Sequence, residues 1–220
     1  MKSMILAAGR GERMRPLTDT IPKPLLEVNG KPLIIWHIEK LAKSGFKEII
    51  INVAHFGYKI IEALGDGSKW GVKVIYSDEQ NEGALESAGG IVKALALLGS
   101  EPFLVVNADI WTDFNFNASF NLGDDLAHLV LVKNPEHNLG GDFGLVSNRV
   151  LSDADEKYTF SGIGYYKPQI FKHLNYGKSA LAPVLRDLMR QNVVSGELLS
   201  GSWIDVGTPK RLEEINKNIF

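Results

Sequence analysis

The sequence contains no cysteine, and this absence excludes several kinds of site. Without a thiol the protein has no disulfide, no thiolate-bound metal and no cysteine nucleophile. A long apolar run is also missing, because no stretch reaches the roughly eighteen apolar residues that a membrane-spanning helix needs. The first apolar run, residues 4–8, is followed directly by arginine-rich sequence, which does not fit a secretory signal. We therefore expect a cytoplasmic protein.

A strong excess of one charge is missing as well. Lys and Arg number 24 against 26 Asp and Glu, which gives a formal net charge of −2. General binders of nucleic acid or of membrane surfaces carry a basic excess, so neither is an expected partner. The length of 220 residues and the 45% hydrophobic content are typical of one globular domain, residues 1–220. We expect a monomer or a small homo-oligomer that binds anions only locally.

Short apolar runs alternate with helical patterns. In the first half, strands are predicted at 3–8, 48–54, 72–77 and 102–109, and helices at 33–44, 58–64 and 91–99. In the second half, strands are predicted at 128–133, 143–151, 160–167 and 203–206, and helices at 181–191 and 209–219. The alternation predicts an α/β fold with a Rossmann-like, mainly parallel central sheet and helices on both faces.

The stretch MILAAGRGERMRPLTDTIPKPLLEVNG, residues 4–30, gathers four cations among glycines and prolines: Arg10, Arg13, Arg15 and Lys23. Gly9 and Gly11 allow backbone N–H groups to approach an anion, because glycine has no Cβ in the way. Arginine offers a planar fork that matches phosphate oxygens, and lysine offers a compact point charge. We interpret the stretch as a cradle for a polyphosphate. The alternative is a solvated basic loop beside a tight turn.

Two better-known phosphate loops do not describe this stretch. A dinucleotide-binding loop needs a small residue where Met14 stands, and it needs an acidic residue at the end of the next strand. The predicted strand 48–54 ends without a carboxylate, and no GxxxxGK[ST] sequence occurs in the chain.

The pattern L-A-A-G-x-G-x-R-M-x-P-L-T at residues 6–18, followed by P-K-P-L at 22–25, resembles the signature of the sugar-1-phosphate nucleotidyltransferases. Further segments are similar to that family's nucleobase loop, metal strand, sugar motif and second metal motif: 85–90, 106–109, 160–163 and 203–208. The resemblance spans almost the whole chain. It implies that a sugar-1-phosphate oxygen attacks the α-phosphorus of a nucleoside triphosphate and that pyrophosphate leaves.

The resemblance also implies roles for individual residues. Those expected to bind the nucleotide are Leu6, Ala7, Ala8, Gly9, Gly11, Arg13, Lys23, Glu86 and Ser87. Arg13 is expected to meet the triphosphate and Lys23 the α-phosphate, so these two cations are the catalytic candidates. The roles of Arg10 and Arg15 stay open. Glu86 stands where the wider family commonly has glycine.

Asp109 and Asp205 are the expected metal ligands, since each lies at the C-terminal end of a predicted strand, where open α/β sheets bind ligands. Two carboxylates and substrate phosphates suit Mg²⁺, although the number of ions stays open. The nearby Asp113 is interpreted as a turn residue. The sugar-binding candidates are Asn107, Asp142, Gly144 and Gly162, with a structural loop role as the alternative for Asp142. The five histidines are interpreted as structural or surface residues.

The resemblance also indicates which substrates to expect. The loop at 85–90 is similar to the Leu-Glu-Thr-Gly-Gly-like loop of a small uridylyltransferase group, which favours UTP. Segments 128–135, 141–143 and 159–162 favour N-acetylmuramate-1-phosphate, used in peptidoglycan recycling, as the sugar. Hexapeptide repeats are missing, so no β-helix domain is expected.

Two alternatives stay open. The first is a mannose-1-phosphate guanylyltransferase or another small sugar- or alcohol-phosphate nucleotidyltransferase. The second is an inactive nucleotide-sugar sensor on the same fold, because a fold does not determine a function. The presence of all four candidate catalytic and metal residues, Arg13, Lys23, Asp109 and Asp205, disfavours the sensor.

Overall fold

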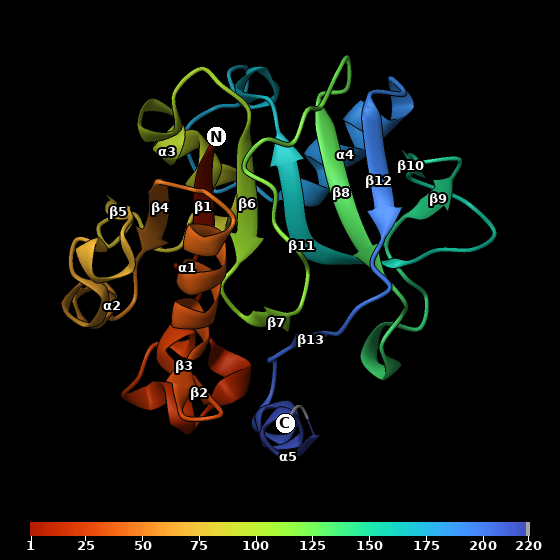
Figure 1. Cartoon of the computed structure of the whole chain (residues 1–220). Helices are drawn as coiled ribbons and strands as arrows, with labels where there is room; N and C mark the ends of the chain where they lie inside the picture. Colours follow the sequence, from red (N-terminus) through yellow and green to blue (C-terminus); the bar gives the residue numbers. More distant parts are fainter. Residues whose placement is uncertain (219–220) are drawn as a thin grey trace.

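The computed structural model describes residues 1–218, and its centre is a sheet of nine strands in the order β5-β4-β1-β6-β11-β8-β12-β10-β9 (Figure 1). Four strands come from the first half of the chain: β1 (Lys2–Leu6), β4 (Glu48–Val53), β5 (Lys73–Asp78) and β6 (Phe103–Asn107). They are parallel to one another. The inner three are mostly buried, which explains why their sequences are continuous apolar runs instead of alternating ones.

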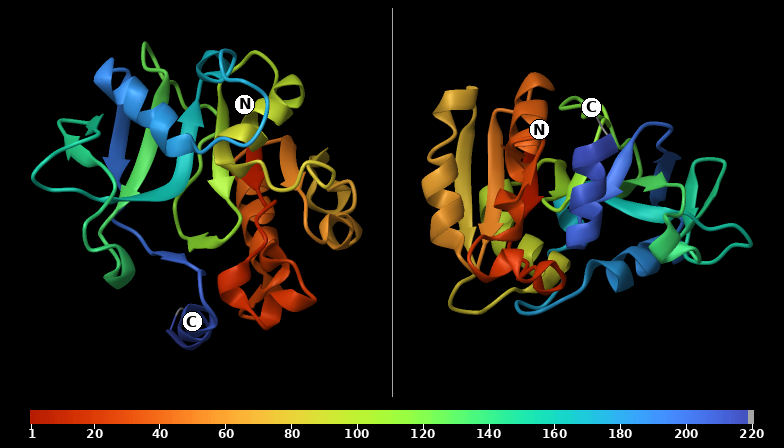
Figure 2. Two further views of the ribbon diagram at one scale, coloured as in Figure 1. Left: turned by 180° about the vertical axis from the view of Figure 1, so that it is seen from behind. Right: turned by 90° about the horizontal axis from the view of Figure 1, so that it is seen from below.

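Helices cover both faces of this sheet (Figure 2). They are α1 (Leu33–Lys43), α2 (Gly57–Leu64), α3 (Glu86–Leu98) and α4 (Leu181–Arg190). The apolar sides of α1 and α2 share one core with the sheet, and those of α3 and α4 share the other. The predicted Rossmann-like architecture is confirmed. Within residues 1–218, no helix combines the length and the apolar character that crossing a membrane requires.

The second half of the chain extends the sheet beyond β6. The strand β11 (Thr159–Tyr166) runs antiparallel to β6 and to β8 (Ala127–Val132), and β12 (Val194–Leu198) lies parallel to β8. A hairpin of β9 (Gly144–Val146) and β10 (Arg149–Leu151) completes the edge. The pairings make seven of the nine strands run in one direction, so the sheet is mixed and mainly parallel.

The sequence predictions were wrong or incomplete at three elements. The strand predicted at 143–151 is a hairpin, because Ser147 and Asn148 have φ values of 47° and 65° and form a tight turn. The strand β12 was not predicted, since Gly196 and Glu197 interrupt its apolar pattern. Helix α3 begins at Glu86 and not at residue 91, because small residues that suggested a loop are packed closely in its first turns.

Two small sheets and the last helix lie beside the main sheet. The strand β7 (Ile110–Thr112) pairs with β13 (Trp203–Asp205), and β2 (Glu27–Val28) pairs with β3 (Lys31–Pro32). Helix α5 (Pro209–Asn218) packs against β2 in a separate small core made of Met14, Leu26, Val28, Leu33, Val206 and Ile215. The final residue of the predicted helix 209–219 lies outside the described residues. This small core ties the glycine-rich loop to the C-terminal helix.

One buried histidine links α1 to β7. His37 is 2% exposed, and its Nε2 donates a hydrogen bond of 2.8 Å to the carbonyl oxygen of Ile110. Burial lowers the pKa of His37 from 6.5 to about 4, so the ring is neutral in the folded protein at neutral pH. The interpretation of this histidine as structural fits its position.

We expect the free energy of unfolding to fall as the pH is lowered from 6.5 towards 4, because in that window the unfolded chain binds a proton that folded His37 does not. The contribution of this residue is about 3 kcal/mol over the whole window. Urea denaturation of the wild type and of His37→Gln, which keeps a donor for the Ile110 carbonyl, should show a shallower pH dependence in the variant. An identical pH dependence in both would contradict this assignment.

Candidate active site

A cleft of about 820 Å³ lies at the carboxyl ends of β1 and β6. The order of the parallel strands reverses there, since β4 and β5 lie on one side of β1 and β6 on the other. All nine predicted nucleotide-binding residues line this cleft: Leu6, Ala7, Ala8, Gly9, Gly11, Arg13, Lys23, Glu86 and Ser87. Asn107 and Asp109 line it from the end of β6. The fold therefore brings the glycine-rich segment and the start of α3, which lie far apart in the sequence, together in one cleft.

Close contacts with Thr18 and Lys23 fix the backbone of the glycine-rich loop at Gly11. Gly11 has a φ of 66°, and a Cβ there would lie 3.0 Å from Thr18 Cγ2 and 3.1 Å from Lys23 Cβ. The Thr18 hydroxyl donates a hydrogen bond of 2.8 Å to the Gly11 carbonyl oxygen. Met14 is buried, whereas its neighbour Arg13 is exposed along the cleft. The loop thus presents its arginine to the cleft while its apolar side is anchored.

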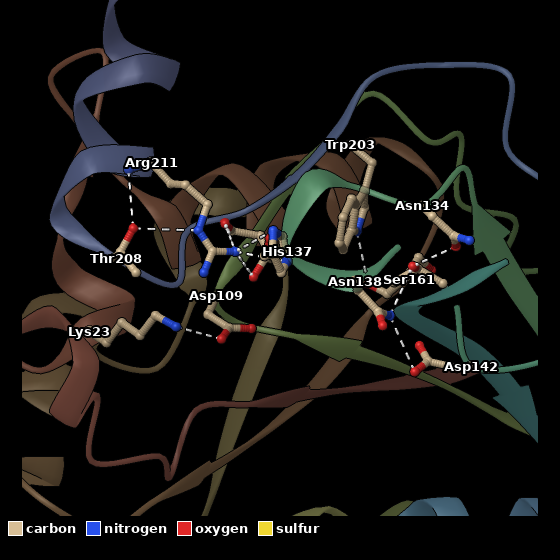
Figure 3. Close-up of polar contacts among 12 residues, drawn as sticks. Lys23, Asp109, Asn134, His137, Asn138, Asp142, Ser161, Trp203, Thr208 and Arg211 are labelled. Carbon is tan, nitrogen blue, oxygen red and sulfur yellow. Dashed lines mark hydrogen bonds and ion pairs between the residues drawn. The ribbon is translucent and has the colours of Figure 1, made fainter. Parts of the chain in front are cut away.

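Lys23 extends from this loop to β6, as Figure 3 shows. Its side chain is 10% exposed, and its Nζ lies 2.5 Å from Oδ2 of Asp109. Pro22 and Pro24 flank it and limit its backbone freedom. The structure therefore places one predicted phosphate-binding cation directly beside one predicted metal ligand.

Asp205 reaches the same edge from the other end of the chain. It is the last residue of β13, and the next residue, Val206, donates its N–H to the Asp109 carbonyl oxygen at 2.7 Å. The Asp205 carboxylate pairs with Arg211 of α5 and with His137, whose Nε2 lies 3.1 Å from Oδ1 (Figure 3). The two predicted metal-ligand residues are thus neighbours, and each carboxylate faces a basic side chain.

Sequence reasoning missed Arg211 and His137 as parts of this site. Arg211 follows Asp205 by six residues, a spacing that could have drawn attention to it. His137 comes from a distant loop and carried no local signal, so it was interpreted as structural or surface. Among residues 1–218, no group of three or more His, Cys, Asp or Glu side chains is arranged to hold a metal. Any cation bound by Asp109 and Asp205 would need further ligands from substrate or water.

A buried polar chain supports the floor of the cleft. The Ala7 N–H donates to Oδ1 of Asn52 at 2.7 Å, and Asn52 Nδ2 donates to Oε1 of Glu79 at 2.8 Å. The Leu85 N–H donates to Oε2 of Glu79 at 2.9 Å. Glu79 is fully buried, and burial raises its pKa. This chain, also missed from the sequence, connects the end of β1 to the start of α3.

The start of α3 has an unusual backbone. Glu86 has a φ of 61°, a left-handed conformation that glycine adopts at low cost and that other residues rarely adopt. Oε1 of Glu86 lies 3.4 Å from Nζ of Lys178. The carbonyl oxygen of Ser179 accepts hydrogen bonds from the N–H groups of Ala88 and Gly89. Residues 177–179 therefore cap the start of α3, which lines one side of the cleft.

A second cavity of about 460 Å³ shares Glu86, Ser87 and Asn107 with the cleft. Asp142 lines this cavity, and its Oδ2 accepts a hydrogen bond of 2.8 Å from the Phe160 N–H. Asn138 Nδ2 donates to Oδ1 of Asp142 at 3.3 Å (Figure 3). Asn107 and Asp142, both predicted to bind sugar, are therefore at one cavity.

The other two sugar candidates have packing reasons for being glycine. Gly162 lies in a bulge of β11 with a φ of 81°, and a Cβ there would be 2.5 Å from Nδ2 of Asn107. A Cβ on Gly144 would be 2.4 Å from the Cβ of Ala154. Gly162 thus makes room for Asn107, while Gly144 makes room for a loop.

The remaining cationic and acidic candidates differ in position. Arg10 lines the cleft, whereas Nε of Arg15 lies 3.3 Å from Oδ1 of Asp19 on the surface. Asp113 accepts a hydrogen bond of 2.8 Å from the Ser202 N–H at the end of the β7–β13 pair. A structural role for Asp113 follows from this contact.

We expect Gly162→Ala to destabilise the fold by about 2–3 kcal/mol, because it adds both backbone strain and a clash with Asn107. Gly123→Ala is a matched control, since Gly123 also has a positive φ but has open space around its Cβ position. Urea denaturation should give the control only about 1 kcal/mol of loss, the cost of placing an L-residue in the left-handed conformation. Equal losses in the two variants would contradict the proposed contact with Asn107.

Comparisons with known proteins agree with this geometry. The chain matches the family described as Nucleotidyl transferase over residues 2–220. An N-acetylmuramate alpha-1-phosphate uridylyltransferase of Neisseria meningitidis is 56% identical, with 97% of this chain and 96% of that protein covered. One of the same name from Caulobacter vibrioides is 32% identical, with 94% and 92% covered.

A solved structure extends the likeness to the fold. It is a Bacillus anthracis protein described as a glucose-1-phosphate thymidylyltransferase, with a TM-score of 0.85 and 24% identity over 99% of this chain and 94% of that one. With a family match over nearly every residue and a relative that is 56% identical over nearly its full length, the chain belongs to the nucleotidyl transferase family.

Proposed function

We propose that the protein transfers UMP from UTP to N-acetylmuramate α-1-phosphate and releases UDP-N-acetylmuramate and pyrophosphate. The observation that carries this proposal is the juxtaposition of Arg13, Lys23 and Asp109 in the cleft, with Asp205 held beside Asp109 through Val206 and a second cavity next to the cleft. The similarity to two uridylyltransferases of that name over nearly their full lengths supports the choice of substrates. The proposal includes peptidoglycan recycling as the role, the cytoplasm as the compartment, and a monomer or small homo-oligomer as the working form.

The chemistry needs cations more than it needs a base. An oxygen of the sugar phosphate, already an anion, forms a bond to the α-phosphorus, and the bond from that phosphorus to the β-phosphate oxygen breaks. Pyrophosphate leaves with the electron pair. The obstacles are repulsion between anions and in-line positioning. Arg13 and Lys23 reduce the repulsion, and the contact with Asp109 orients the Lys23 ammonium group at the cleft.

The residues fit a divalent cation with oxygen ligands. Val206 and β13 hold Asp205 beside Asp109, and both carboxylates are partly exposed at the cleft edge. Two carboxylates leave coordination positions for phosphate oxygens and water, a donor set that suits Mg²⁺. When bound there, Mg²⁺ would neutralise charge on the phosphates. Lys23 and Arg211 balance the charges of the two carboxylates.

We expect Asp109→Asn and Asp205→Asn to lower turnover by about a thousandfold or more, because each removes a charged ligand of the cation. The assay is pyrophosphate release with Mg²⁺, and EDTA should abolish it in the wild type. Asp113→Asn is the matched control, because Asp113 contacts Ser202 and can still accept that hydrogen bond as asparagine. Wild-type turnover in either of the first two variants would refute the metal site.

The substrates are tested by crossing UTP, GTP, dTTP and CTP against several sugar-1-phosphates in the same assay. We expect strong turnover only for UTP with N-acetylmuramate-1-phosphate. Turnover with GTP and mannose-1-phosphate would keep the mechanism and replace the substrates. A folded protein that binds nucleotide but turns over no pair would be a sensor.

A further inference from the structure

One arginine in the second cavity has no role in the chemistry above. The cleft carries several cations, whereas Arg186 of α4 is the only Lys or Arg among the described residues that line the second cavity. It does not line the cleft itself. Arg186 therefore lies in the part of the second cavity that is separate from the nucleotide cleft.

The Arg186 side chain packs on an aromatic ring but has no hydrogen-bonding or ionic partner among the described residues. Its Cζ lies 5.7 Å from the centre of the Phe143 ring, whose residue is 2% exposed. Within residues 1–218, no hydrogen bond or ion pair engages its guanidinium group. The neighbouring Asp187 pairs instead with Arg190, at 2.9 Å, on the exposed side of the helix. A guanidinium that rests on an aromatic ring and lacks an anion is free to take one from a ligand.

The acidic groups of the cavity already have polar partners. Glu86 lies 3.4 Å from the ammonium group of Lys178, and Asp142 accepts hydrogen bonds from Phe160 and Asn138. Neither carboxylate is bonded to Arg186. A negative group on a ligand in this cavity would therefore pair with Arg186. Phe143 and Phe160 supply apolar walls around it.

We infer that Arg186 binds a carboxylate on the acceptor sugar and so selects an acidic sugar phosphate over a neutral one. The inference rests on the proposed function, because N-acetylmuramate differs from N-acetylglucosamine by a lactyl ether that ends in a carboxylate. The sugar phosphate would enter the cleft through the wall shared at Glu86, Ser87 and Asn107. The planar fork of arginine matches a carboxylate with two parallel hydrogen bonds. Arg186 is thus a specificity-determining residue and takes no part in the phosphoryl transfer.

The test compares two acceptors, N-acetylmuramate-1-phosphate and N-acetylglucosamine-1-phosphate, with UTP as the donor. We expect Arg186→Gln to lower kcat/KM for the acidic sugar about 10- to 100-fold, mainly through KM, with the loss confined to that sugar. Arg190→Gln is the matched control, since Arg190 lies on the same helix and pairs with Asp187 outside the cavity. It should leave the preference of the wild type intact.

A second test removes the negative charge from the ligand instead of the positive charge from the protein. The methyl ester of the lactyl carboxylate should bind the wild type as weakly as the acid binds Arg186→Gln, and the variant should not distinguish ester from acid. Equal losses for both sugars in the variant, or no loss for either, would overturn the inference.

Isothermal titration calorimetry with the same sugar phosphates separates this inference from the proposed function. If the wild type turns over neither sugar, the proposed function fails. The inference still stands if the wild type binds the acid more tightly than the neutral sugar and Arg186→Gln abolishes the difference. A binding preference that survives in the variant refutes the role of Arg186 whatever the turnover is.

Discussion

The parallel pairing of β1 between β4 and β6 is the constraint on which the site depends. The register aligns Leu6 with Asn52 on one side and with Asn107 on the other. The glycine-rich loop leaves β1 between these two strand ends, so the cleft forms where the strand order reverses. Backbone pairing on both sides holds β1 as far as Leu6. The Ala7 N–H then donates to the Asn52 side chain, and the Asn52–Glu79 chain extends that support to α3.

A second element ties the ends of the chain together. The small core beneath the loop includes Met14 from its first turn and Val206 and Ile215 from the C-terminal arm. The same arm delivers Asp205 to the side of Asp109 through the Val206 hydrogen bond. The proposed phosphate-binding cations and the proposed metal ligand Asp205 therefore belong to one packed unit, although they lie almost 200 residues apart in the chain. Long-range packing of this kind holds reacting groups in fixed positions, which is what an anion-on-anion reaction requires.

Charge is balanced locally in a protein whose net charge is close to neutral. Lys23 balances the charge of Asp109, and Arg211 balances that of Asp205. Burial makes this balance necessary at Lys23, because a nearly buried ammonium without a partner is costly. The second cavity is different, since its carboxylates have polar partners whereas its arginine rests on an aromatic ring.

Local patterns in the sequence determined much of this protein: the apolar runs of the inner strands, the amphipathic α1, and the clustered cations and carboxylates that line the cleft. These features depend on residues close together in the chain, so periodicity and motif spacing reveal them. Only the tertiary structure decided the pairing of β12 and the contacts of Arg211, His137 and Glu79. Each of these depends on groups brought together from distant segments, and the free energy of such contacts comes from packing and burial that no local pattern records.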